Sequence, residues 1–419
     1  MVNFYSLVVY VSSFIGLFAA IFYAINLYYY YKKYKYKESE DKTVSIIIPA
    51  YNEEKSIEKT ILSALAIDYP KNKLEIIVVD DGSRDRTYEI AKKFESFKDP
   101  KLKVLKKKNG GKGSALNLGI NNSKADIIFT MDADTFVNPS TVKRMISFFD
   151  NKLVAAVTPS MGVYKPKSLW QKIQHIEYAL GVFLRKAFAV IDSMHVTPGA
   201  FSAYRRNFFK KYGGFDEKNI TEDLEIALRI QSKKLRIENV PEAIVYTSAP
   251  KTFNELLVQR RRWYSGLIKN LWNYRNLFGI NKGPLGILVL PLALMTMFVP
   301  TILTVYVVIK RLIKIKNDLD YLVIINYKFG SIFELNSYVF EKYLFSLFSQ
   351  PLFLLSILFI SILALYLFFS NKNKLDLTNA KLNFVFFLSF YLLLSALWWI
   401  ISFFYVITNR KIIWRSEDG

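Results

Sequence analysis

The chain has 419 residues, of which 52% are hydrophobic and 16% aromatic, and its formal net charge is +22 at pH 7. The absence of cysteine excludes disulfides, thiolate metal sites and cysteine nucleophiles, and the presence of only two histidines argues against a histidine zinc site. A charge this positive fits either a nucleic-acid partner or a membrane boundary that faces anionic lipids. Lysines at 32, 33, 35 and 37 directly follow the first long apolar segment. The charge therefore indicates contact with membrane lipids and no nucleic acid.

Long apolar segments predict membrane helices at both ends of the chain. A spanning helix needs roughly 20 apolar residues, and the segments that contain no charged residue are 1–31, 283–309, 343–371 and 382–409. The first segment lacks the basic start and short apolar core of a signal peptide, so we expect a retained N-terminal transmembrane helix. The other three define a C-terminal transmembrane region over 283–409. A fifth crossing near 321–340 stays open, and with it the side on which the C-terminus lies.

Between these membrane segments, residues 40–280 have the pattern of an α/β domain. Apolar, β-branched runs predict buried strands, and amphipathic segments between them predict helices. The strands are expected at 44–49, 74–79, 102–105 and 126–131, and the helices at 52–65, at 87–94 and from Ser114 onward. This alternation predicts a parallel, doubly wound, Rossmann-like sheet whose ligands bind at the carboxyl ends of its strands.

Two motifs follow the first two predicted strands. In the first, PAYNEE over 49–54, Asn52 is expected to cap the helix that begins there, with acidic residues in its first turn. The motif contains no G-x-G-x-x-G, so an NAD-binding site is disfavoured. In the second, DDGS, Asp81 is placed to accept a hydrogen bond from a nucleotide base, although the same residues also suit a simple turn.

Two further motifs indicate a site for a diphosphate. The glycine-rich segment 109–115 places Lys112 just before a helix, which suits a phosphate group, and its spacing is not that of an ATP-hydrolysing Walker A loop. Asp132 and Asp134 follow the fourth predicted strand. Two carboxylates in D-x-D spacing are able to reach a hard cation on a diphosphate, so we expect them to bind Mg²⁺ or Mn²⁺.

Of the last two motifs, one heads a helical pattern over 224–230 and the other lies on a predicted amphipathic helix over 253–272. In Thr-Glu-Asp over 221–223, Asp223 is a candidate general base, and complementing the helix dipole is the alternative role. In QRRRW over 259–263, arginines suit a diphosphate leaving group and Trp263 suits stacking on a sugar. The helices at 168–187 and 253–272 are expected to lie in the membrane interface, and the alternative is that they are surface helices of a soluble domain.

In this order, the motifs PAYNEE, DDGS, GGKGSALN, DAD, TPGAFSAYRR, TED and QRRRW resemble those of the inverting family 2 glycosyltransferases, which have a GT-A fold. The flanking membrane helices resemble the processive branch, which includes cellulose, chitin, hyaluronan and poly-N-acetylglucosamine synthases. The resemblance implies that Asp223 is the catalytic base. The nucleotide-sugar-binding residues that it implies are Pro49, Tyr51, Glu53, Asp81, Lys112, Asp132, Asp134, Gln259, Arg262 and Trp263. The acceptor-binding residues that it implies are Gly199, Ala200, Phe201, Glu222 and Trp263.

The expected protein is thus a multi-pass enzyme of the cell membrane with a cytoplasmic catalytic domain. By resemblance, it transfers a sugar from a UDP-sugar, with UDP-GlcNAc or UDP-glucose favoured, to a growing β-linked polysaccharide, and export of the product stays open. A single-transfer enzyme that acts on a lipid-linked acceptor is the alternative. From another functional class, a non-catalytic membrane scaffold or export channel also remains.

Overall fold

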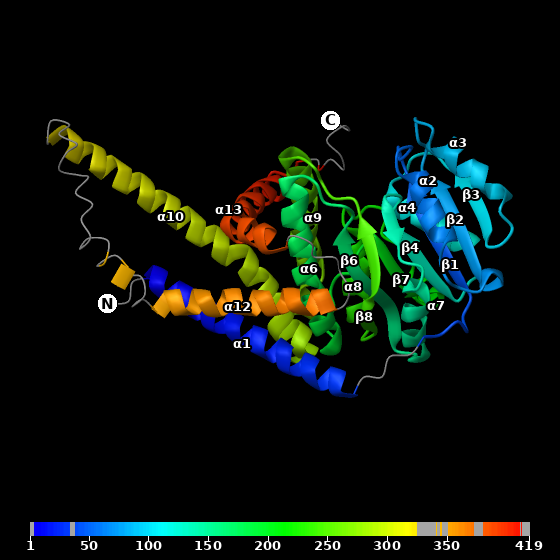
Figure 1. The fold of residues 1–419 in the computed structure, drawn as a ribbon, viewed down its shortest axis with the longest axis horizontal. Helices are drawn as coiled ribbons and strands as arrows, with labels where there is room; N and C mark the ends of the chain where they lie inside the picture. Colours follow the sequence, from blue (N-terminus) through cyan, green and yellow to red (C-terminus); the bar gives the residue numbers. More distant parts are fainter. Residues whose placement is uncertain are drawn as a thin grey trace.

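The computed structural model describes residues 4–33, 38–324, 341, 344–345, 351–372, 380–410 and 412. It consists of an α/β domain and a group of long helices that extend away from one side of that domain (Figure 1). Two helices of the domain, α6 and α9, lie between the sheet and the long helices. The predicted fold class, an α/β domain together with a helical region, is confirmed.

The described residues form one eight-stranded sheet with the order β3-β2-β1-β4-β7-β6-β8-β5. Strands β1 to β4 pair in parallel, whereas β7 is antiparallel to β4 and to β6, and β5 is antiparallel to β8. The four predicted strands are parallel as expected, but the sheet as a whole is mixed, because β5 and β7, which were not predicted, pair antiparallel with their neighbours. The strands are β1 (Val44–Ala50), β2 (Leu74–Asp80), β3 (Lys101–Lys106), β4 (Ile127–Met131), β5 (Thr135–Val137), β6 (Val154–Val163), β7 (Phe201–Arg205) and β8 (Arg236–Thr247).

The parallel strands are buried on both faces, which explains their continuous apolar sequences. Along β1, Ile46 and Ile48 belong to one hydrophobic core, while Ile47 points into the core on the opposite face. Helix α4 packs closely on that face, because a Cβ added at Gly119 would lie 2.4 Å from the Ile47 side chain. The helices of the domain are α2 (Ile57–Leu65), α3 (Thr87–Lys92), α4 (Lys112–Asn122), α5 (Thr141–Ile146), α6 (Leu169–Val190), α7 (Arg206–Tyr212), α8 (Glu222–Ser232) and α9 (Phe253–Asn273).

The predicted start of the first helix is wrong. Helix α2 begins at Ile57, and Asn52 has a φ of 54° in the loop before it. Asn52 does not cap a helix, because its backbone N–H donates to Ser83 Oγ at 3.0 Å and its side chain accepts from Arg84 N at 2.9 Å. The residue thus joins the loop after β1 to the loop after β2.

The long apolar helices agree with the four predicted segments. They are α1 (Phe4–Lys33), α10 (Leu290–Ile324), α12 (Pro351–Lys372) and α13 (Ala380–Ile407). Among the described residues, three helices are long and apolar enough to cross a membrane, and they cover Leu7–Lys33, Leu285–Asn317 and Phe353–Lys372. The two parts of α13 are bent by 43° between Tyr391 and Leu394 and would make a fourth span if counted together. The fifth crossing considered at 321–340 lies outside the described residues, apart from its first turn.

Helix α6 joins the sheet to the apolar helices. Its Phe183 ring stacks on Tyr366 of α12 with centroids 3.8 Å apart, and Phe188 meets Tyr23 of α1 edge-on at 5.4 Å. Helices α6 and α9 run across the direction of α1 and α12 (Figure 1). This arrangement is compatible with the predicted interfacial position of both helices, because a helix in the membrane plane lies across one that spans it.

Candidate active site

The centre of the site lies beyond the carboxyl end of β4. The backbone N–H of Asp132, the first residue after the strand, donates to Ala200 O at 3.0 Å. Lys112, the first residue of α4, places its ammonium group 2.6 Å from Asp132 Oδ1 and 3.0 Å from Glu222 Oε1. One lysine from the glycine-rich loop thereby joins the D-x-D motif to the Thr-Glu-Asp motif.

Asp223 lies next to this lysine at the start of α8. Its Oδ2 accepts from Gly199 N at 3.3 Å, and its backbone carbonyl accepts from the Thr197 hydroxyl at 2.8 Å. A Cβ added at Gly199 would lie 2.8 Å from Lys112 Nζ and 3.3 Å from Asp223 Oδ2, so glycine leaves room for both groups at this point. Four of the sequence motifs therefore meet at one point.

Burial and the charges of this cluster shift the pKa values of the two neighbouring carboxyl groups, Glu222 and Asp223, in opposite directions. Burial, followed by the charge of Glu222, raises the pKa of Asp223 to about 6, although Lys112 and Arg262 oppose the rise. Burial alone would also raise the pKa of Glu222, but Lys112 and Arg262 outweigh it and lower that pKa. Burial would lower the pKa of Lys112, but Asp132, Glu222 and Asp223 raise it above the usual lysine value. Asp223 is thus a carboxylate able to accept a proton near neutral pH.

On the β2 side of the site, Asp81 organises the glycine-rich loop. Its side chain is almost fully buried and accepts from Lys107 Nζ at 2.7 Å, Gly110 N at 3.1 Å and Gly111 N at 2.8 Å. Both carboxylate oxygens therefore have partners within the chain. The predicted contact between Asp81 and a nucleotide base stays a prediction, and the structure gives Asp81 a role in shaping the loop.

The PAYNEE residues lie at the end of β1, beside the loop that follows β2. Pro49 is the register partner of Val79 within the sheet, and Tyr51 is the half-buried residue directly after the strand. Glu53 accepts from the Ser56 hydroxyl, and its backbone N–H donates to Thr87 Oγ1 at 2.7 Å. These contacts fix the predicted nucleotide-binding residues on one edge of the site.

The D-x-D carboxylates lie in the turn between β4 and β5, where Thr135 N donates to Asp132 O at 3.0 Å. Asp132 and Asp134 flank the buried Ala133, and Asp134 Oδ1 accepts from the Thr247 hydroxyl at 3.4 Å. The described residues contain no group of three or more histidine, aspartate or glutamate side chains able to hold a metal. Two hard carboxylates nevertheless fit Mg²⁺ or Mn²⁺, because such ions commonly take their remaining ligands from substrate phosphates and water.

The QRRRW residues do not all face the same way. Arg262 Nη1 lies 3.5 Å from Ile220 O, just before the Thr-Glu-Asp motif, and Trp263 packs against a cluster that contains Tyr178. Gln259 Oε1 is buried without a hydrogen-bond partner among the described residues. Arg260 instead points into the interface of α9 with α6, where it pairs with a glutamate.

Of the residues assigned to the acceptor, Gly199 and Glu222 lie beside Lys112 and Asp223. Phe201 is fully buried, and its ring packs on Phe129 with centroids 5.2 Å apart. The side chain of Phe201 therefore supports the sheet core beneath the site.

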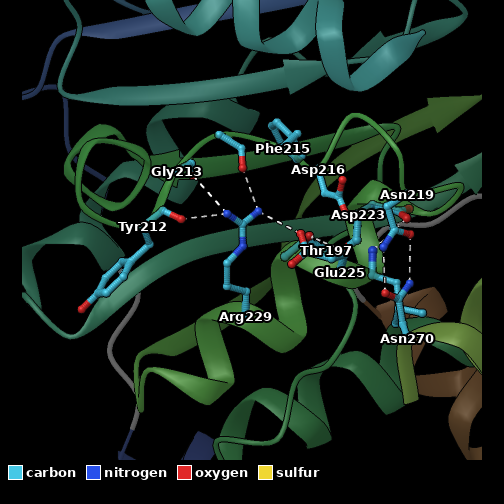
Figure 2. A network of polar contacts seen from close by, with 12 residues as sticks. Thr197, Tyr212, Gly213, Phe215, Asp216, Asn219, Asp223, Glu225, Arg229 and Asn270 are labelled. Atoms are coloured by element: carbon cyan, nitrogen blue, oxygen red, sulfur yellow. Dashed lines mark hydrogen bonds and ion pairs between the residues drawn. The ribbon is translucent and has the colours of Figure 1, made fainter. Parts of the chain in front are cut away.

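Sequence reasoning missed a polar network that holds the surroundings of Asp223 (Figure 2). Arg229 donates to the backbone carbonyls of Tyr212, Gly213 and Gly214 at 2.9, 3.2 and 2.8 Å, and to Glu225 at 2.8 Å. The network fixes the segment before α8, in which Glu217 lies beside Gly113 of α4. Backbone acceptors leave no pattern in the sequence, so no signal marked these residues.

A second part of the network joins α8 to α9. Asn270 donates to the Thr221 hydroxyl at 2.9 Å and faces Asn219 (Figure 2). A Cβ added at Gly266 would lie 2.2 Å from Thr221 Oγ1. This close approach keeps the Thr-Glu-Asp motif against the helix that carries QRRRW.

A mixed sheet with a D-x-D segment and a buried carboxylate beside it is the arrangement of a GT-A glycosyltransferase domain. Residues 45–213 match the family model "Glycosyl transferase family 2". For this segment the predicted family and enzyme class are confirmed.

Relatives extend the match beyond this segment. The chain is 29% identical over 276 residues to a poly-beta-1,6-N-acetyl-D-glucosamine synthase of Staphylococcus epidermidis, which covers 62% of this chain and 66% of the relative. It is 34% identical over 244 residues to the probable glycosyltransferase YdaM of Bacillus subtilis, covering 56% and 57% of the two chains. The chain thus spans less than two thirds of the length of these curated relatives.

A solved structure supports the fold over nearly the whole chain. The mannosyltransferase PcManGT of Pyrobaculum calidifontis, in complex with GDP-Man and Mn²⁺, superposes with a TM-score of 0.59 at 19% identity. The superposition covers 96% of this chain and 100% of the other. At this identity the likeness concerns the fold alone.

Proposed function

We propose that the chain is a membrane-embedded inverting glycosyltransferase that adds N-acetylglucosamine from UDP-GlcNAc to a growing β-linked polysaccharide. The observation that carries the proposal is the cluster in which Lys112 joins Asp132 to Glu222, beside the carboxylate of Asp223. It brings the candidate donor-side and acceptor-side groups within one site. The names of the Staphylococcus relatives favour N-acetylglucosamine over glucose as the transferred sugar.

In the proposed reaction, Asp223 removes the proton of the acceptor hydroxyl, which attacks the anomeric carbon on the face opposite the diphosphate. An α-linked donor would thus give a β linkage. Lys112 and Arg262 supply positive charge for the leaving diphosphate, and such preorganised charge is a major source of rate enhancement. Asp132 and Asp134 would hold the Mg²⁺ or Mn²⁺, which when bound neutralises charge on the diphosphate.

The proposed domain limits are 1–31 for the N-terminal helix, 40–280 for the catalytic domain and 283–409 for the C-terminal membrane region. Lys32 and Lys33 end α1 on the side of the catalytic domain, and the positive-inside tendency favours a cytoplasmic position for that side. The proposal therefore places the enzyme in the cell membrane, with several crossings and a cytoplasmic active site. Its partners are the nucleotide sugar, the acceptor and membrane lipids.

The test is incubation of the full chain in lipid nanodiscs with a panel of nucleotide sugars, followed by mass spectrometry of the products. We expect UDP-GlcNAc to be consumed, products that differ by one N-acetylglucosamine, and no reaction in EDTA until Mg²⁺ or Mn²⁺ is added. If only UDP-glucose were consumed, the donor would be UDP-glucose and the assignment of UDP-GlcNAc would be wrong. A folded protein that consumes none of the sugars would be a scaffold or channel.

A second candidate, a single transfer to a lipid phosphate acceptor, is favoured by Arg185 on α6. Its Nε and Nη2 are buried and have no hydrogen-bond partner in the part of the chain that the structure describes. These two donors form the edge of the guanidinium that binds a phosphate in bidentate fashion. Products that carry one sugar on a lipid, instead of a ladder, would support this candidate.

A further inference from the structure

Arg260 belongs to the QRRRW motif, yet its charge is used away from the donor site. The side chain is 2% exposed and lies between α9 and α6. Its Nη1 and Nη2 donate to Glu177 Oε1 and Oε2 at 2.7 and 2.5 Å, which is a bidentate pair. A buried cation is tolerated only when it is paired in good geometry, so the position of Arg260 depends on Glu177.

The last apolar helix completes the surroundings of this pair. Tyr391 of α13 donates its hydroxyl to Glu177 Oε1 at 2.8 Å, at the residue where α13 bends. Seven residues further on, the buried Trp398 ring lies 5.4 Å from Arg260 Cζ and meets the Tyr391 ring edge-on at 5.9 Å. Helix α13 thus contacts both members of the pair.

On its other side, Arg260 contacts the candidate sugar platform. Its Cζ lies 4.5 Å from the centroid of the Trp263 ring, at cation–π distance. The same indole packs against the cluster of Val163, Tyr178 and Ala249. The Trp263 ring is therefore held between this cluster and a guanidinium whose position is set by α6 and α13.

We infer that Glu177 and Tyr391 are positioning residues, which act through Arg260 to hold Trp263 as the platform for the acceptor sugar. The inference rests on the proposed function, because it assigns Trp263 to the acceptor. It makes α13 part of the acceptor site as well as a membrane helix. An ion pair that only joined helices would instead affect folding and leave the balance between donor and acceptor unchanged.

The test uses Glu177→Gln and Tyr391→Phe in the full chain in nanodiscs. The probes are UDP-GlcNAc, with binding measured by calorimetry, and a β-linked N-acetylglucosamine oligomer, with transfer measured by UDP release. A displacement of the acceptor by about 1 Å lowers the reaction rate by roughly 10²-fold. We therefore expect transfer to fall by roughly 10²-fold in Glu177→Gln and by about tenfold in Tyr391→Phe. The loss should appear as a raised KM for the oligomer, with unchanged affinity for UDP-GlcNAc and partial recovery in Glu177→Asp.

Tyr405→Phe is the matched control. Tyr405 joins α13 to α9, because its hydroxyl accepts from Arg261 Nη1 at 3.0 Å. We expect wild-type transfer from it. Normal transfer by folded Glu177→Gln and Tyr391→Phe would overturn the inference, as would an equal loss in Tyr405→Phe or a parallel loss of UDP-GlcNAc binding. If Glu177→Gln does not fold, Tyr391→Phe decides, since it lacks only one hydroxyl. Absence of transfer in the wild type would contradict the proposed function itself.

Discussion

The two sides of the active site are assembled from contacts between residues that are separated by very different distances along the sequence. On the β2 side, Asp81 holds the backbone of Gly110 and Gly111, 29 and 30 residues away, and all three lie in the loops that follow the parallel strands β2 and β3. On the α9 side, Glu177 pairs with Arg260 83 residues away and with Tyr391 214 residues away. The candidate donor side is thus complete within the α/β domain, whereas the candidate acceptor side depends on an apolar helix.

This difference separates the expected effects of substitutions. Changes at Trp263 and at the residues that hold it should alter transfer while donor binding persists, because the loops after β1 and β2 keep their own hydrogen bonds. Asp223 lies between the two sides and should show the largest effect.

Asp223→Asn should lower transfer by about 10²–10⁴-fold, because an amide cannot accept the hydroxyl proton as a general base. Transfer is measured by UDP release and UDP-GlcNAc binding by calorimetry. Asp216→Asn, which removes an exposed carboxylate in the same network, is the control and should keep wild-type transfer. Wild-type turnover in Asp223→Asn would exclude the base role.

Trp263→Ala should lower transfer by roughly 10²-fold through misplacement of the acceptor, with little change in UDP-GlcNAc affinity. Trp272→Ala is a matched control, since it removes an indole that is 71% exposed on the same helix. If donor binding fell as far as transfer in Trp263→Ala, the indole would be a wall of the nucleotide pocket. The contrast between the two sides would then be lost.

Below about pH 6, transfer should fall roughly tenfold per pH unit, because Asp223, whose pKa burial raises to about 6, becomes protonated. A raised carboxyl pKa adds stability only while the group is protonated, and that contribution is lost as pH rises through about 6. Asp223→Asn should therefore melt at a higher temperature than the wild type at pH 8. A transfer rate that is flat between pH 5 and pH 7 would contradict the assignment.

Gly266→Ala should have the smallest effect, a loss of about 1–3 kcal/mol of unfolding free energy from overpacking against Thr221. Denaturant unfolding of the full chain measures it. Thr221→Ala makes room for the added methyl group. The double variant should therefore lose less unfolding free energy than the two single variants lose together. Strict additivity would show that α9 and α8 do not press on each other at this point.

The sequence predicted the parallel strands well, because strands buried on both faces need apolar residues at every position, as in Ile46, Ile47 and Ile48. Residues after such strands, including Asp81 and Asp132, were placed at the site for the same reason. The antiparallel pairing of β7 was missed, since its direction depends on how the chain returns from α6 to the sheet.

Contacts between distant segments limited the prediction of individual residues. Asn52 has the right chemistry for a helix cap, but Ser83 and Arg84 bind it instead. The Arg260–Glu177 pair was not predicted either, because both residues also fit the polar faces of amphipathic helices. Only the packing of α6 against α9 reveals that these faces meet.

The position of Tyr391 in the chain has a consequence for biosynthesis. Arg260 is synthesised 131 residues before Tyr391, counting from 260 to 391. At typical translation rates of about 5–20 residues per second, Tyr391 is synthesised roughly 7–26 s after Arg260. A nascent chain that has completed its α/β domain would thus hold donor while its acceptor platform is still unsupported. If the proposed function holds, chains that stall before α13 would therefore transfer little sugar.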